Sequence, residues 1–403
     1  MGSHSNRTIR THSYGTIPLQ TVRILIDYRP ALHHRTGVGE FIHNLIVSLA
    51  DTSNSNLVDA TPDITAFSSS WKDRLSDSLA SPLPPSVKLV DKRVPVKLLN
   101  LAWHRWEWPP VEHLTRNSYE VVHSPHPLLI PSRSAAQVIT IHDLDFLTNT
   151  DRTRAEIRRD YSRLVQDHAS RADHIVVPSK YTASKVQEQL GIRQELITIC
   201  PNGSPNWSPR ERTPSNGHLL FVGELTDRKN ISGLLNAYEL LLANATDAPD
   251  LVLAGKQSNT STWRQRLSQS PLAGHVHCTG YVDRTTLKEL YSNASALLFP
   301  SFDEGFGLPA LEAMAIGVPV VAARRGALPE VIGNAGLLVD PDDDQMFSDA
   351  MRRLLQDRRL ARECRDKGIV QAKTFSWNHS AKKLVTAYKK AVLYRSSKRC
   401  SSA

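Results

Sequence analysis

Apolar and polar positions follow two different periods along the first half of the chain. Residues 22–27 form a run dense in β-branched side chains, and after a turn that contains Gly37 and Gly39 the apolar positions of residues 41–49 recur at helical spacing. A strand, a glycine-containing turn and a helix predict the opening of a doubly wound α/β domain. Further strand candidates follow at residues 120–123, 138–142 and 174–178, with a long helical stretch at 153–171. This alternation predicts a parallel sheet covered by helices on both faces.

The same alternation restarts in the second half of the chain. Its strand candidates lie at residues 218–222, 250–254, 276–279, 296–299 and 318–322. Residues 201–214, between the two series, are rich in Pro, Gly, Asn and Ser and form the best candidate for an interdomain linker. The predicted fold class is therefore α/β, with two Rossmann-like doubly wound domains that face each other across a cleft and bind ligands at the carboxyl ends of their strands.

Composition narrows the class of protein. The chain has 403 residues, enough for two domains, and its 40% hydrophobic and 22% charged residues are typical of globular proteins. No apolar run approaches the length needed to span a bilayer, and the first twenty residues are polar and lack the apolar centre of a signal peptide. We therefore expect a cytoplasmic protein. Four scattered cysteines indicate neither a disulfide framework nor a zinc site.

The net charge adds one expectation about partners. A formal charge of +9 and a pI near 9.4 favour anionic partners such as phosphates or an anionic lipid surface. No recognisable nucleic-acid-binding module accompanies this charge, so nucleic acid is not an expected partner.

The most specific stretch of the sequence is residues 304–312, which follow the strand candidate at 296–299. Gly305 and Gly307 allow a tight turn, and the backbone amides at the start of the next helix suit a phosphate group. Glu304 and Glu312 are expected to line one pocket, where ionised carboxylates accept hydrogen bonds from sugar hydroxyls. The alternative is an ordinary strand-to-helix turn with a surface glutamate.

Two glutamates separated by seven residues around a Gly-Phe-Gly-Leu-Pro turn resemble the signature of the family 4 glycosyltransferases. Other segments resemble the same family, namely residues 141–143, 178–179, 201–203, 223–230 and 317–321. The resemblance covers nearly all of the chain from Val22 to about Tyr394. It implies a retaining enzyme of the GT-B fold that needs neither a cofactor nor a metal ion.

The resemblance also implies an organisation of the chain. It predicts a disordered tail over 1–20, an N-terminal acceptor-binding Rossmann-like domain over 21–203, a C-terminal nucleotide-sugar-binding Rossmann-like domain over 204–376, a helix over 377–395 that returns to the N-terminal domain, and a tail over 396–403.

Within the C-terminal domain, the resemblance assigns the donor site. Gly223 starts the phosphate-binding segment, in which Arg228 and Lys229 neutralise the pyrophosphate. Many family members carry Arg where this chain has Glu224, so the cationic role rests on the two later residues. The sugar is held by Glu304 and by the residues that follow it, which are Gly305, Phe306, Gly307 and Leu308. Glu312 is expected to bind the ribose. The alternative for the two cations is a solvated basic turn.

From the N-terminal domain, the resemblance assigns three further residues. His142 is expected to point into the cleft from a strand end and to orient the sugar or the acceptor, which with Arg228, Lys229 and Glu304 makes four expected catalytic residues. Gly37 and Gly39 resemble a glycine loop that approaches the donor phosphate. A structural histidine and a plain glycine turn are the alternatives.

Three acidic features have simpler interpretations. Asp143 and Asp145 match the DxD pattern of metal-dependent transferases, but we interpret the match as a coincidence because the implied fold needs no such metal. Glu330 either contacts the donor or caps the helix that follows it. Residues 340–344 are interpreted as a helix start and not as a cation site.

A cluster of tryptophans lies where the sequence predicts acceptor binding. Trp103, Trp106 and Trp108 neighbour Lys97 and Arg105, which is typical either of a patch that leans on anionic lipid or of a helix packed by its tryptophans. We favour the second interpretation. The basic helix at 152–171 is expected to be a solvated face, and residues 394–399 to be disordered.

Together these features predict a retaining hexosyltransferase. The preferred donor is GDP-mannose, because the 225–230 loop and the His-Ser-Pro-His-Pro segment at 123–127 resemble bacterial mannosyltransferases of surface polysaccharide synthesis. The expected acceptor is a hydroxyl of a saccharide or lipid-linked saccharide, reached by a cytoplasmic protein that touches the inner face of the membrane. A sugar-nucleotide epimerase of the same fold and a catalytically silent nucleotide-sugar-binding protein are the alternatives.

Overall fold

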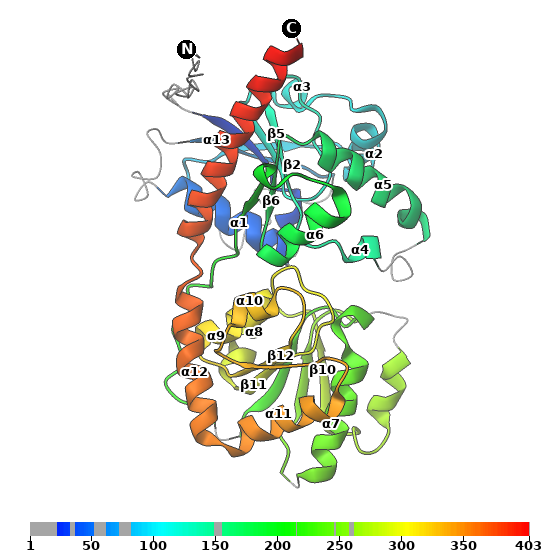
Figure 1. The fold of residues 1–403 in the computed structure, drawn as a ribbon, viewed down its shortest axis with the longest axis vertical. Helices are drawn as coiled ribbons and strands as arrows, with labels where there is room; N and C mark the ends of the chain where they lie inside the picture. The colour runs from blue at the N-terminus through cyan, green and yellow to red at the C-terminus, as the bar shows by residue number, and fades with distance from the viewer. Residues whose placement is uncertain are drawn as a thin grey trace, which may run out of the picture.

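The computed structural model describes residues 22–32, 37–51, 62–71, 82–148, 155–214, 216–245, 247–257 and 262–402. Two α/β halves lie one above the other along the long axis of the molecule, each built on a parallel sheet (Figure 1). The predicted fold class is confirmed. The predicted tail at 1–20 lies outside the described residues.

The N-terminal half is a seven-stranded sheet with the order β3-β2-β1-β4-β5-β6-β7. Its strands are β1 (Arg23–Asp27), β2 (Asp63–Ser69), β3 (Lys88–Lys92), β4 (Val121–Ser124), β5 (Ala136–Thr140), β6 (His174–Val177) and β7 (Ile197–Ile199). Its helices are α1 (Gly37–Ala50), α2 (Val96–Trp106), α3 (Val111–Thr115), α4 (Asp145–Thr148), α5 (Ala155–Arg171) and α6 (Lys180–Leu190). Ile24 and Ile26 pack toward α1, whereas Leu25 packs toward α2 and α3, so the two faces of the sheet have separate cores.

The C-terminal half is a six-stranded sheet with the order β10-β9-β8-β11-β12-β13. Its strands are β8 (His218–Val222), β9 (Leu251–Ala254), β10 (Val276–Gly280), β11 (Ala294–Phe299), β12 (Val320–Ala323) and β13 (Leu337–Val339). Its helices are α7 (Ile231–Asn244), α8 (Arg284–Ser292), α9 (Leu308–Ile316), α10 (Leu328–Ile332), α11 (Asp344–Gln356) and α12 (Arg358–Lys373). In both sheets the order turns back on itself, at β1/β4 and at β8/β11, and these are the points where doubly wound folds bind ligands.

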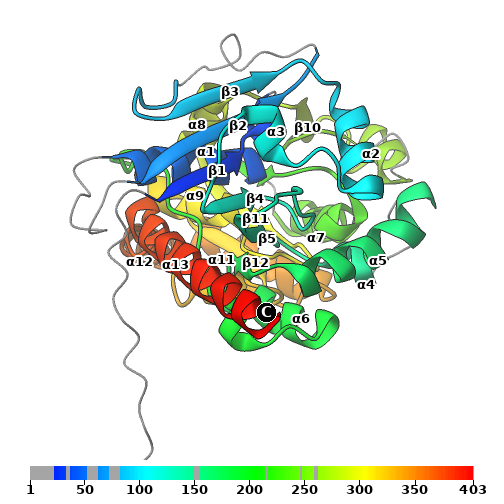
Figure 2. The same ribbon diagram turned by 90° about the horizontal axis from the view of Figure 1, so that it is seen from above.

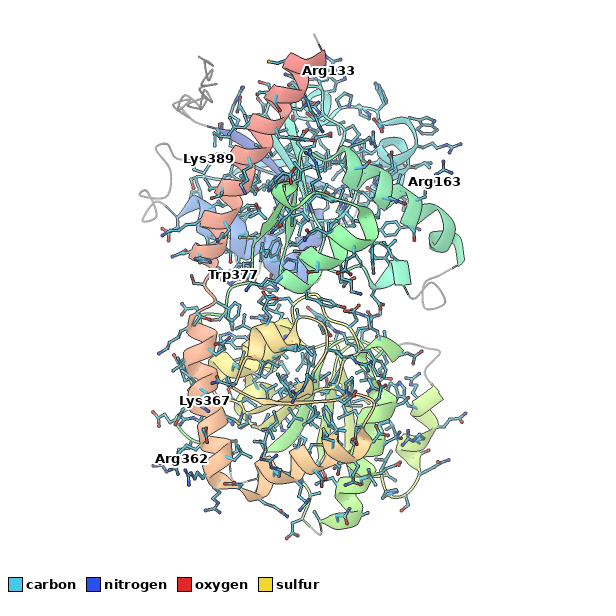
Figure 3. All side chains as sticks on the ribbon, viewed as in Figure 1. Arg133, Arg163, Arg362, Lys367, Trp377 and Lys389 are labelled. Atoms are coloured by element: carbon cyan, nitrogen blue, oxygen red, sulfur yellow. The ribbon has the colours of Figure 1, made fainter. Side chains whose placement is uncertain are left out.

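The last helix, α13 (Trp377–Ser402), leaves the C-terminal half and lies along the N-terminal sheet (Figures 1 and 2). Its buried face, which includes Leu384 and Tyr388, belongs to the same core as α1. Trp377 lies at the junction of the two halves, as Figure 3 shows. A Cβ atom on Gly203 would come within 2.4 Å of the Trp377 backbone nitrogen, so the two chain segments that connect the halves touch at this point.

Three local predictions are wrong. Helix α13 does not end at 395, and residues 394–399 are helical, because the fully buried Asp173 lies 3.6 Å from Arg395 Nη1 and 3.4 Å from Lys398 Nζ. Gly37 and Gly39 lie inside helix α1 and not in a loop before it. Strand β5 ends at Thr140, two residues before the predicted end.

Candidate active site

The carboxyl ends of β8 and β11 bring one predicted cation and the first predicted glutamate together. Lys229 lies in a 3₁₀ turn, Asp227–Lys229, that follows β8, and Glu304 lies in the loop between β11 and α9. Lys229 Nζ donates a hydrogen bond to Glu304 Oε1, and only 10% and 9% of the two side chains are exposed. Because the two strands are neighbours in a parallel sheet, residues that follow them meet at the same edge.

The charge of Glu304 follows from these contacts. Burial by itself raises the pKa of Glu304, but attraction to Lys229 and Arg228 outweighs it and holds the pKa below its usual value. The carboxylate therefore stays ionised and accepts hydrogen bonds without donating any. A buried anion of this kind suits a ligand rich in hydroxyl groups.

Arg228 reaches from the same turn toward the N-terminal half. Its Nη1 donates to the Asp303 carbonyl oxygen at 2.9 Å, and it lies 3.8 Å from Asp143 Oδ2. Its Nε lies 3.7 Å from Asp145 Oδ2. The Asp143-Leu-Asp145 segment therefore faces a cation of the opposite half. A small pocket at this junction is lined by Asp143, Tyr181, Thr182 and Asp303, among others.

The loop between β11 and α9, which the resemblance assigns to the donor and which we call the donor loop, touches the N-terminal half through Gly305. A Cβ atom at this position would lie 1.8 Å from the His142 carbonyl oxygen, so only glycine fits. The Gly305 carbonyl accepts hydrogen bonds from Ser179 Oγ at 2.7 Å and Thr182 Oγ1 at 3.1 Å. Ser179 is also the N-cap of α6, since its Oγ accepts the Thr182 backbone N–H. The sequence motif contained Ser179, but its contact with the donor loop was not predicted.

His142 lies at the same junction, two residues past β5. Its Nε2 donates to the Pro125 carbonyl oxygen at 3.1 Å, and its ring packs edge-on against Phe41 at 4.9 Å. Burial lowers the pKa of His142 to about 4, so the ring is neutral at physiological pH. With the proton on Nε2, the Nδ1 atom is an acceptor. Nδ1 has no hydrogen-bond partner in the described part of the chain.

The rest of the donor loop is defined by its backbone geometry and by core packing. Gly307 is the N-cap of α9 with a φ of 99°, and Leu308 is the first helical residue. The Phe306 side chain is 6% exposed and packs edge-on against Phe375 at 5.7 Å, so it faces the core. Gly223 follows β8, and its carbonyl oxygen would lie 1.8 Å from a Cβ on Gly255.

Glu312 has a partner that the sequence did not suggest. It lies in α9 with 3% of its surface exposed, and its Oε1 accepts a hydrogen bond from Arg284 Nη1 at 2.5 Å. Its Oε2 accepts from the Tyr291 hydroxyl at 3.0 Å. Burial raises the pKa of Glu312 against the attraction of Arg284. Arg284 also lies 3.8 Å from Glu40 Oε1 of α1 and 4.6 Å from the centre of the Trp207 ring.

Other predicted residues lie in settings that were not expected. A Cβ on Gly39 would come 2.9 Å from the Pro30 carbonyl oxygen, which explains this glycine by close packing, whereas a Cβ on Gly37 would meet nothing within 4 Å. Glu330 differs from both expectations, because it accepts the backbone N–H of Lys180 at 2.9 Å and so caps α6 in the opposite half.

The interpretation of α2 as a helix packed by its tryptophans is wrong for two of the three. Trp103 is 1% exposed, but Trp106 and Trp108 are 66% and 64% exposed. No helix in the described part of the chain is long and apolar enough to cross a membrane. A cavity of about 760 Å³ between β13 and α11 is lined by none of the predicted site residues.

Two family models match the chain. Residues 55–205 match "Glycosyltransferase Family 4" and residues 207–371 match "Glycosyl transferases group 1". The O-antigen chain mannosyltransferase B of Escherichia coli is 32% identical over 283 residues, which cover 67% of this chain and 74% of that protein. The MMP alpha-(1->4)-mannosyltransferase of Mycolicibacterium hassiacum is 30% identical over 230 residues, or 56% of each chain.

Solved structures share the architecture. Sucrose-phosphate synthase from Thermosynechococcus elongatus superposes with a TM-score of 0.72 at 19% identity, covering 91% of this chain and 98% of that one. The Anabaena protein HepE in complex with UDP and glucose superposes with a TM-score of 0.63 at 15% identity, covering 91% and 98%. At these identities the likeness shows the fold, which is GT-B.

Proposed function

The chain belongs to the family 4 glycosyltransferases, and on that premise we propose that it transfers mannose from GDP-mannose, with retention, to a hydroxyl of a saccharide or lipid-linked saccharide. The names of the relatives support the sugar, since both O-antigen chain mannosyltransferase B and the MMP alpha-(1->4)-mannosyltransferase are described as moving mannose. The guanine base and the retained configuration rest on the family resemblance.

One observation supports the donor site above all others. Arg228, Lys229 and the ionised Glu304 lie together at the carboxyl edge of the C-terminal sheet, where α9 also begins. Two cations stabilise the diphosphate as negative charge develops on it, and the carboxylate and the loop amides hold the sugar. Burying charges of both signs costs free energy of folding. Their presence next to a ligand-binding edge therefore favours a ligand-binding role for these residues over a purely structural one.

The proposed reaction needs little more than correct positioning of the donor and the acceptor. The acceptor oxygen bonds to the anomeric carbon on the face that the diphosphate leaves, and the acceptor proton passes to an oxygen of the departing diphosphate. No carboxylate of the proposed site is assigned as a nucleophile beneath the sugar. Catalysis in this scheme comes from alignment of the two substrates and from charge stabilisation of the leaving group.

His142 and Glu312 complete the proposal. The neutral His142 ring presents Nδ1 as an acceptor for a hydroxyl of the sugar or of the acceptor, a role for which imidazolium is unsuited. Glu312 binds the ribose, for which the ribose hydroxyls share or replace the hydrogen bond from Arg284.

The test is a comparison of two double variants with a panel of GDP-, UDP- and ADP-sugars. Arg228→Ala with Lys229→Ala removes both cations of the site, and we expect kcat/KM with GDP-mannose to fall about 10³-fold or more. Lys288→Ala with Arg359→Ala removes two exposed cations of the same half and serves as the control. Products are identified by mass spectrometry.

Four outcomes contradict parts of the proposal. Unchanged turnover in the Arg228, Lys229 variant removes the donor-site assignment. An isomerised sugar nucleotide identifies an epimerase. Binding of GDP-mannose without release of sugar or transfer product identifies a silent binding protein, and preference for a UDP- or ADP-sugar removes the GDP-mannose assignment alone.

A further inference from the structure

Helix α2 has two apolar faces, and only one of them is buried. Leu99 and Trp103 point into the core of the N-terminal half and are 2% and 1% exposed. On the other face Leu98 and Leu101 are 60% and 53% exposed. A helix whose outer face carries exposed leucines has an apolar surface that its own core does not use.

The end of the helix extends this surface. Glu107 ends α2 in the left-handed conformation at a φ of 49°, and the chain then turns through Trp108. Trp106 and Trp108 are two residues apart at this helix end, and they are 66% and 64% exposed. We refer to Leu98, Leu101, Trp106 and Trp108 as the α2 patch.

Three exposed cations lie around the α2 patch. Arg93, Lys97 and Arg105 are exposed, and none of them forms an ion pair within the described part of the chain. The nearby carboxylate, Glu107, is engaged by Arg171 at 2.5 Å. The α2 patch thus combines exposed aromatic and aliphatic side chains with unneutralised cations.

The patch also has a defined place relative to the active site. Arg29, which follows β1 at its carboxyl end, donates to Asn100 of α2 at 2.8 Å and stacks on Trp103 at 4.8 Å. Ser69, at the carboxyl end of β2, donates to the Val94 carbonyl oxygen just before α2. Helix α2 is therefore anchored to residues at the carboxyl ends of β1 and β2, on the side of the N-terminal half away from α13 (Figures 1 and 2).

We propose that the α2 patch docks on an anionic membrane, with Trp106, Trp108 and the two leucines in the boundary between headgroups and acyl chains and with Lys97 and Arg105 on lipid phosphates. Tryptophan suits this boundary because its ring is apolar and its N–H is polar. A second copy of the chain is a poorer occupant, because a two-fold interface would place these cations against their own counterparts.

This docking brings the N-terminal half, to which the proposed function assigns the acceptor, to the lipid surface. That consequence rests on the proposed function, whereas the docking itself does not. Vesicle binding is measured without a donor, and donor binding is measured without vesicles, so failure of one proposal is distinguishable from failure of the other.

The experiment compares matched variants on vesicles of phosphatidylcholine alone and with about one third phosphatidylglycerol. Trp106→Ser with Trp108→Ser is expected to raise the Kd for anionic vesicles about tenfold or more. Its control is Val370→Ser with Leu393→Ser, which removes exposed apolar side chains from α12 and α13. Brominated acyl chains should quench tryptophan fluorescence in the wild type, and the quenching should be lost in the tryptophan variant.

A second pair of variants tests the charge. Lys97→Gln with Arg105→Gln should weaken binding to anionic vesicles severalfold and leave binding to neutral vesicles unchanged, with the difference removed by high salt. Lys382→Gln with Lys383→Gln, two exposed lysines of α13, is the control.

Any of four results overturns the proposal. Two concern the tryptophans: the wild type does not bind vesicles, or the tryptophan variant binds them like the wild type. The other two are loss of binding in the Lys382, Lys383 variant instead of the Lys97, Arg105 variant, and a wild-type dimer that the tryptophan substitutions convert to a monomer. Circular dichroism and the thermal shift with GDP-mannose confirm that each variant is folded.

Discussion

The two sheet edges that face each other are built from different chemistry. The C-terminal edge presents charge, in the buried pair of Lys229 and the ionised Glu304. Around Gly305 the N-terminal edge meets it with neutral groups, namely the uncharged ring of His142 and the hydroxyls of Ser179 and Thr182. Its charged groups, Asp143 and Asp145, face Arg228 instead. The contrast fits the proposed function, in which the C-terminal half binds the diphosphate and the N-terminal half binds hydroxyl groups and positions the donor loop.

The largest expected effect comes from the place where the two edges touch. In Gly305→Ala the new methyl group would lie 1.8 Å from the His142 carbonyl oxygen, so the donor loop or the whole N-terminal half must move. A displacement near 1 Å is expected to lower kcat/KM about 10²-fold while each half stays folded. Steady-state kinetics and circular dichroism measure the two effects.

The control for this variant is Gly368→Ala in α12. Its new Cβ would lie 3.3 Å from Met314 Cγ and 3.5 Å from Met314 Cα, which needs only a small shift, and activity should be unchanged. Near-normal activity in Gly305→Ala would mean that the two edges need not meet during the reaction.

An intermediate effect on stability is expected from lowering the pH, and it should differ between the two halves. Burial lowers the pKa of His123 from 6.5 to about 3. Below pH 6.5 the unfolded chain therefore binds a proton that the folded chain does not bind. Stability is therefore lost as the pH falls from 6.5 toward 3, by about 2 kcal/mol at pH 5 from this group alone. Glu304, whose pKa is lowered, gives stability that is kept until the pH falls below 4.5.

Hydrogen exchange followed by mass spectrometry at pH 7 and pH 5 resolves the halves. The N-terminal half should lose protection first, although the lowered pKa of His218 adds a smaller acid sensitivity to the other half. His123→Gln should flatten the decline. If the C-terminal half lost protection first, acid sensitivity would not follow the buried neutral histidine, and the contrast drawn between the two halves would be wrong.

The smallest effect is expected at the far end of α13. Arg395→Ala with Lys398→Ala leaves the fully buried Asp173 with its hydrogen bond from the Gln137 backbone but without cations. We expect a loss of about 1 kcal/mol in the free energy of unfolding, confined to the N-terminal half. Urea unfolding measures it, and the matched variant Lys382→Ala with Lys383→Ala should lose less.

The sequence predicted what depends on neighbours in the chain. Residues 304–312 follow a strand and run from a turn into a helix, so the places of Glu304 and Gly307 followed from local rules. The two-domain α/β fold followed in the same way from alternating periods. The pairing of Lys229 with Glu304 was not among these predictions, because it depends on β8 and β11 being neighbours in the sheet.

What the sequence did not predict depends on partners distant in the chain. Arg284 meets Glu312 from another helix, and Glu330 caps a helix of the opposite half. The tryptophans of α2 were misjudged because periodicity does not tell which of two apolar faces is buried, and because Trp108 lies beyond the helix end. These features depend on how elements pack, which pattern alone leaves open.

The course of α13 bears on how the chain folds as it is synthesised. The core of the N-terminal half includes Leu384 and Tyr388, and Tyr388 bonds the buried His123 at 2.8 Å. These residues are translated after the whole C-terminal half. On the ribosome, the second half can finish folding before the first, which keeps an open apolar face until α13 emerges. The half that is made first is thus completed last. A chaperone that shields the apolar faces of β4 and β5 would be needed until α13 has been synthesised.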